Sequence, residues 1–170
     1  MNQFIFFSLG TYQFCITKNF FMKHLSIIYK TSAHHTGLII RMAIALVMLP
    51  HGCQLAFGWF GGMGFNNSMQ YLTAIEGLPW LLAFNVIFLQ IAGSLLILFG
   101  CMGRFLGASM IVLFIGMIVT SHLQFGLFMN WMGNQAGEGF EFHLLAIGLC
   151  TALMAGGSGS YSIDRLLSRP

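Results

Sequence analysis

Charged side chains are scarce in this sequence. Only 6% of its 170 residues are charged, 57% are hydrophobic, and the mean hydropathy is +0.81. A soluble domain carries about 25% charged residues. A globule of this size also keeps about a third of its surface exposed, so it could not bury all these apolar side chains. The composition excludes an ordinary soluble protein and predicts one whose solvent is the lipid bilayer.

Basic runs are absent as well. The net charge is only +3, and no stretch combines clustered Lys and Arg with interleaved aromatic residues. That combination is typical of proteins that bind nucleic acids, so no nucleic-acid partner is predicted.

Paired cysteines are missing too. The four cysteines form no Cys-x-x-Cys pair and are scattered at Cys15, Cys53, Cys101 and Cys150. Zinc and thioredoxin-like sites need closely spaced thiols, and a disulfide needs two Cα atoms within about 7 Å. No metal site is predicted, and the cysteines are interpreted as small apolar core residues.

Long apolar runs, in contrast, are abundant. A helix needs roughly 20 largely apolar residues to cross ~30 Å of hydrocarbon, and four segments qualify, at about 38–60, 79–99, 105–128 and 139–157. None shows the alternation of a barrel strand, and open sheets leave their backbone unsatisfied in lipid. The predicted fold is all-α, a polytopic membrane protein with a four-transmembrane-helix bundle at 37–167 and a short cytoplasmic tail at 158–170.

The basic residues predict an orientation. All seven Lys and Arg lie in the amino-terminal arm, at the start of the first span, between the second and third, or in the tail, whereas the loops at 61–78 and 130–138 have none. Positive charge stays on the cytoplasmic side, so both termini are predicted to be cytoplasmic. The three tryptophans lie at the opposite ends of the spans, where interfacial aromatics belong: Trp59, Trp80 and Trp131.

The amino-terminal arm at 1–36 has two open interpretations. Its apolar stretch at 4–16 is too short to span, and no basic residue precedes it, which does not fit a cleaved signal peptide. Either translation starts at Met22 and the preceding residues are a start-site artefact, or the arm starts at Met1 and lies on the membrane surface.

Polar side chains inside the predicted spans are costly and mark candidate functional sites. At ~1.5 Å of rise per residue, every helix places some of them in the outer half of the bundle: His51, Gln54, Asn85, Gln90, His122, Glu141 and His143. The cytoplasmic half has little beyond Arg41, which can snorkel. Glu141 and His143 are two residues apart and point to nearly opposite sides, so only one of them faces a shared cavity.

Each of these residues also has a structural interpretation. The histidines would serve as interhelical hydrogen-bonding partners, the amides as packing contacts, and Glu141 would lie among lipid headgroups. The convergence of His51, His122 and Glu141 at one depth favours a functional cavity.

Ordered motifs add a family resemblance. They are HGCQLAFGWFGGMG at 51–64, IAGSLLILFG at 91–100 followed by Arg104, EFH at 141–143 and GSGSYSID at 157–164. Together they resemble the DoxX family (DoxX/DoxD-like) over about 38–167. The resemblance implies a four-helix protein of the bacterial cytoplasmic (inner) membrane. The best-described members of that family are small subunits of quinone-linked oxidoreductases, such as thiosulfate:quinone oxidoreductase, so the resemblance also implies a role of this kind.

The sequence departs from the family pattern at two positions. Members often carry Lys where Ala56 stands and an acidic residue where Gln90 stands. Losing both weakens any mechanism that needs a carboxylate in the middle of the membrane. The titratable groups left in the outer half are His51, His122 and Glu141.

A quinone mechanism follows as a hypothesis. The headgroup would bind at His51, Gln54, Gln90 and His122, with the tail between helices. His51 and His122 would exchange protons, because the histidine pKa of about 6.5 lies near neutrality. Glu141 at the mouth would pass protons to or from the periplasm.

Electrons would have to come from a partner subunit, because the sequence has no flavin, iron–sulfur or other redox motif. The chain would then be a non-autonomous part of an enzyme. Two alternatives stay open. One is haem with axial His51 and His122. The other is a non-catalytic membrane scaffold or a carrier for a small apolar molecule, although the two helical hairpins lack the internal similarity of an inverted-repeat transporter.

Overall fold

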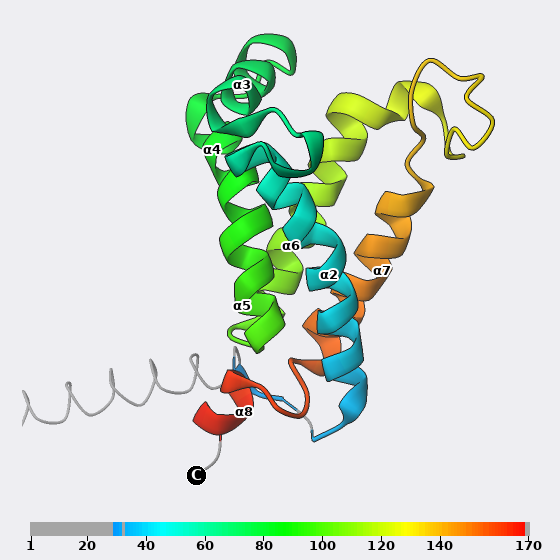
Figure 1. Ribbon diagram of the computed structural model, residues 1–170. Helices are drawn as coiled ribbons and strands as arrows, with labels where there is room; N and C mark the ends of the chain where they lie inside the picture. Colours follow the sequence, from blue (N-terminus) through cyan, green and yellow to red (C-terminus); the bar gives the residue numbers. More distant parts are fainter. Residues whose placement is uncertain (1–28, 32, 169–170) are drawn as a thin grey trace, which may run out of the picture.

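A computed structural model gives the fold of residues 29–31 and 33–168 (Figure 1). Every regular element in these two ranges is helical. Three of the helices are long and apolar enough to cross a membrane, and a fourth apolar helix packs beside them. The predicted all-α membrane bundle is confirmed. The arm predicted at 1–36 lies outside the described residues except for 29–31 and 33–36.

Two of the three long helices include irregular turns. The first of the three is α2 (His35–Phe57). The second is continuous through α4 (Trp80–Phe88), the π-helical segment η3 (Leu89–Gly93) and α5 (Ser94–Phe99). The third runs through α6 (Gly103–Met117), the π-helical segment η4 (Ile118–His122) and the 3₁₀ turn η5 (Leu123–Phe125). The segment η4 lies near the end at which α2 finishes and α4 begins, whereas η3 lies in the middle of the second long helix.

The fourth helix, α7 (Glu141–Gly156), is shorter than the span predicted at 139–157. Its 16 residues rise about 24 Å, short of the ~30 Å of a hydrocarbon core. The helix ends at Gly157, whose φ of +79° is left-handed. It packs closely along α6, because a Cβ added at Gly107 would lie 2.9 Å from the carbonyl oxygen of Cys150.

The apolar side chains divide between a core and an outer belt. The buried core draws on α2, α5, α6 and α7 and includes Ile44, Met48, Ile97, Met110, Phe114, Cys150 and Leu153. Large side chains on the opposite helix faces are 63–71% exposed, namely Leu46, Leu81, Val112 and Leu145. An apolar surface of this extent is one that the bilayer covers.

The two ends of the bundle differ in character. The tryptophan end carries Trp59, Trp80 and Trp131, all exposed, and lies at the top of Figure 1. There the turn η1 (Trp59–Gly61), the helix α3 (Gly64–Gln70) and the π-helical η2 (Tyr71–Ile75) connect α2 to α4. The opposite, arginine end contains Arg41, Arg104 and Arg165.

The carboxy-terminal segment closes the arginine end. Residues 157–168, with the short helix α8 (Ile163–Leu167), fold back against the bundle. Arg41 is only 2% exposed there, and its Nη2 donates to the carbonyl oxygens of Ser160, at 3.0 Å, and Tyr161. The prediction that Arg41 snorkels was wrong, because the returning chain covers its guanidinium.

Asp164 joins this segment to α6. Its carboxylate is 1% exposed and accepts hydrogen bonds from the backbone N–H groups of Met102 (2.7 Å) and Gly103 (2.9 Å) and from the hydroxyl of Ser158 (2.6 Å). The first N–H groups of a helix have no partner inside it, and a negative charge favours that end. Burial raises the pKa of the neighbouring Cys101 thiol, and the charge of Asp164 raises it further.

Candidate functional site

Two adjoining cavities lie near the tryptophan end. The first has a volume of about 410 Å³ and a mostly apolar wall, and we call it the polar cavity after the histidines and amides in its lining. It lies between α2, η3, the end of the third long helix and the start of α7. Its polar lining consists of His51, Gln54, Gln90, His122, Glu138 and His143. Four of the five residues predicted for the site from sequence therefore meet in one space.

A hydrogen-bonded chain holds His51 at this cavity. Its Nδ1 lies 3.2 Å from Oε1 of Gln54, one helical turn further along α2. The Gln54 amide in turn donates from Nε2 to the carbonyl oxygen of Phe60, at 3.3 Å. Phe60 can accept this bond because the turn after α2 brings the chain back, with Phe60 at a φ of +53°.

His122 is held from the other side of the cavity. Its Nδ1 lies 2.9 Å from the backbone carbonyl oxygen of Glu138, in the loop before α7. The carboxylate of Glu138 accepts a hydrogen bond from the backbone N–H of Asn130, at 2.7 Å. The loop at the tryptophan end is thereby tied to the third long helix.

His143 is the most enclosed histidine of the site. It is 6% exposed, and its Nδ1 is buried without a hydrogen-bond partner among the described residues. Its ring centroid lies 4.3 Å from that of His122, 6.0 Å from Phe114 and 5.9 Å from Phe142. A buried polar group without a partner lowers the free energy of unfolding by about 1–3 kcal/mol, so His143 lies in this position at a cost to stability.

Gln90 is the second enclosed polar group. It is 3% exposed, lines both cavities, and its amide makes no hydrogen bond to a residue within 29–31 or 33–168. Gly52 lets α2 approach it closely, since a Cβ there would lie 2.8 Å from the carbonyl oxygen of Gln90.

Glu141 is placed differently from the predicted site. Its carboxylate accepts a hydrogen bond from the indole Nε1 of Trp131, at 3.2 Å, and it lines neither of the two cavities. His143 takes the inward face of α7. Because Glu141 and His143 are two residues apart on a helix, the sequence predicted that only one of them faces the cavity. It did not indicate which one.

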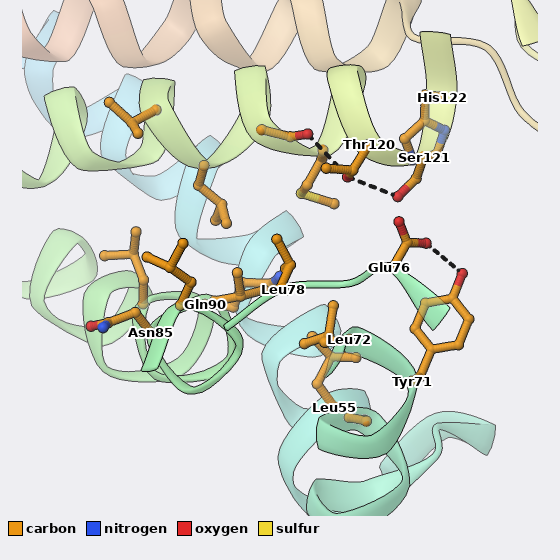
Figure 2. A pocket seen from close by; sticks show the side chains of 18 of the residues that line it. Leu55, Tyr71, Leu72, Glu76, Leu78, Asn85, Gln90, Thr120, Ser121 and His122 are labelled. Atoms are coloured by element: carbon orange, nitrogen blue, oxygen red, sulfur yellow. Dashed lines mark hydrogen bonds between the residues drawn. The ribbon is translucent and has the colours of Figure 1, made fainter. Parts of the chain in front are cut away.

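The lateral cavity, of about 590 Å³, lies between the second and third long helices (Figure 2). Its walls are mostly apolar, with Leu82, Val86 and Leu89 on one helix and Val112, Leu113 and Gly116 on the other. Leu82 is 53% exposed and Val112 71% exposed, so the cavity opens between the helices onto the surface that faces lipid. Asn85, also predicted from sequence, lines it, with its amide bonded to the carbonyl oxygen of Leu81.

Polar groups gather near one end of the lateral cavity. Figure 2 shows Glu76, Thr120, Ser121 and His122 there. The hydroxyl of Tyr71 donates to Glu76, at 2.8 Å, and this hydrogen bond to a carboxylate raises the pKa of Tyr71, with burial and charge adding to it. The cavity thus combines an apolar wall with a polar end.

The two cavities share a boundary. Five residues line both of them: Leu55, Gln90, Met117, His122 and Glu138. Gln90 and His122 belong to π-helical segments, which change the face that a helix presents and often accompany functional sites.

Metal binding has no support in the part of the chain that the structure describes. That part contains no group of three or more His, Cys, Asp or Glu side chains placed to hold a metal ion. The ring centroids of His122 and His143 lie 4.3 Å apart with the rings tilted by 44°, and Nδ1 of His122 is already engaged by the carbonyl oxygen of Glu138.

Comparison with known proteins identifies the family. The DoxX family model matches residues 36–123, more than half of the chain. The motifs at 51–64 and 91–100 fall within this range, whereas those at 141–143 and 157–164 lie beyond it. No curated protein and no solved structure matched the chain. With its helical bundle and its apolar spans, the protein is a membrane-embedded, multi-pass member of the DoxX family.

Proposed function

We propose that this protein is the membrane subunit of a quinone-linked oxidoreductase and binds a quinone across the two cavities. The headgroup would occupy the polar cavity, and the tail would leave through the lateral cavity towards lipid. The observation that carries the proposal is the junction itself, where enclosed polar side chains without partners meet an apolar space open to the bilayer.

The ligand class follows from the chemistry of the two spaces. A polar cavity in the membrane with unpaired Gln90 and His143 favours a head with hydrogen-bonding oxygens. The apolar walls between the second and third long helices favour a flexible hydrocarbon tail. Ligand sites commonly combine apolar walls with a few placed polar groups.

A bound quinone supplies paired electron and proton chemistry. The chain's own contribution would be to orient the head through Gln90 and to exchange protons at His51 and His122, whose Nε2 atoms are not engaged in the bonds described above. Glu138, which lines both cavities, is better placed than Glu141 to connect this site with the outside. Electrons would pass through a partner subunit.

The proposal includes a location. Membership of the DoxX family favours a bacterial cytoplasmic membrane, and the basic residues at the arginine end favour an orientation with both termini inside. Thiol labelling of a Ser168→Cys variant from either side of the membrane checks this orientation.

A binding titration tests the proposed function. We expect saturable binding of a short-tailed benzoquinone to detergent-purified protein, followed by tryptophan fluorescence, with about tenfold weaker binding in His51→Ala. His35→Ala is the matched control because His35 lies at the other end of the same helix α2 and lines neither cavity. Equal binding by wild type and His51→Ala would contradict the role of His51. Absence of saturable binding would instead favour a scaffold or a carrier.

A further inference from the structure

The polar cavity separates hydrogen-bond donors from acceptors. The Gln54 amide nitrogen donates to Phe60, so its Oε1 faces His51 and accepts from Nδ1–H. The carbonyl oxygen of Glu138 can only accept, so His122 also carries its proton on Nδ1. A neutral imidazole has a single N–H. In their neutral forms, His51 and His122 therefore offer a ligand only the lone pair of Nε2.

His143 differs from both. A neutral ring carries one N–H, and neither nitrogen of His143 bonds to another described residue. Nδ1 is fully buried, so Nε2 is the nitrogen that can reach a ligand in the cavity that His143 lines. Phe114, Phe142 and His122 pack around the ring and hold its orientation. With its proton on Nε2, His143 offers the cavity an imidazole N–H that is held in place by packing and has no acceptor among the described residues. Two amides supply further donors: the side chain of Gln90, and the second N–H of Gln54, whose first is bonded to Phe60.

We propose that His143 donates its N–H to a carbonyl oxygen of the oxidised quinone. This inference rests on the proposed function and adds to the headgroup site a residue that the site predicted from sequence did not include. Carbonyl oxygens accept hydrogen bonds and cannot donate them, so an oxidised head needs donors, and neutral His51 and His122 have none to spare. Their Nε2 atoms are suited to accept hydrogen bonds from the hydroxyl groups of the reduced form.

Replacement of His143 tests the inference. A short-tailed benzoquinone, isotope-labelled at its carbonyl carbons, is titrated into wild type, His143→Phe and His143→Gln, and the carbonyl stretch is followed by infrared difference spectroscopy. We expect His143→Phe to remove the shift of one carbonyl band and to weaken binding about tenfold, or about 1.4 kcal/mol. His143→Gln keeps a donor and restores most of the shift. His35→Phe is the matched control and binds as wild type does.

The outcomes separate the two proposals. A carbonyl shift that persists in folded His143→Phe, with binding like that of wild type, would overturn the role of His143 and leave the quinone site standing. No saturable binding by wild type would remove the site itself. If His143→Phe does not fold, the ring-nitrogen resonances of His143 in labelled wild type decide the matter. They shift on quinone addition if the ring donates to the ligand, and unchanged resonances contradict it.

Discussion

Replacing Gly116 with phenylalanine is expected to weaken quinone binding at least tenfold without loss of stability. Gly116 lies on α6 and lines the lateral cavity, and a Cβ added there would meet no atom within 4 Å. The new ring would enter the space proposed for the tail and cost the ligand about 1.4 kcal/mol or more. Glycine is a poor helix former, so the helix itself does not suffer. Fluorescence titration and thermal unfolding measure the two effects.

Gly148→Phe is the matched control for this substitution. Gly148 also lies within a helix, α7, is exposed, has no atom within 4 Å of an added Cβ, and lines neither cavity. It adds the same apolar ring to the lipid-facing surface and should leave binding unchanged. Equal affinities of the two variants would show that the lateral cavity does not hold the ligand.

Asp164→Ala is expected to destabilise the protein by about 2–6 kcal/mol, because two buried N–H groups lose their acceptor at a cost of about 1–3 kcal/mol each. The substitution leaves the N–H groups of Met102 and Gly103 at the start of α6 without their acceptor. It also removes the negative charge that acts on the buried guanidinium of Arg41. The measurement is the unfolding midpoint in detergent, together with the yield of monodisperse protein.

Two further variants sharpen this prediction. Asp164→Asn keeps one acceptor oxygen and loses the charge, so its midpoint should lie between those of wild type and Asp164→Ala. Ser168→Ala, at the exposed end of the same segment, should behave as wild type. A midpoint of Asp164→Ala within error of wild type would mean that the carboxy-terminal segment does not hold the arginine end together.

Hydropathy and charge were enough to predict the bundle, because lipid leaves few alternatives to apolar helices. They were also enough to bring His51, Gln54, Gln90 and His122 to one depth, since rise per residue depends little on side chains. The length of α7 was overestimated, mainly at its start, because the helix begins at Glu141 and not at residue 139, and it ends one residue before Gly157.

The rest depends on contacts that helix periodicity does not specify. The inward turn of His143, rather than Glu141, is set by the bond between Glu141 and Trp131 and by packing on Phe114. The covering of Arg41 by Ser160 joins residues 119 positions apart in the chain. No local pattern in the sequence predicts that the carboxy-terminal segment folds back over Arg41.

Photolabelling with an azido-substituted quinone that carries an isoprenoid tail tests the central claim most directly. Our account predicts label on residues of the lateral cavity, such as Leu82, Leu89 and Val112, and loss of that label when unmodified quinone is added in excess. Label spread over outward-facing residues outside the cavities, such as Leu46 and Leu145, and unchanged by excess quinone would contradict it. That result would mean that quinone dissolves around this protein and does not bind within it.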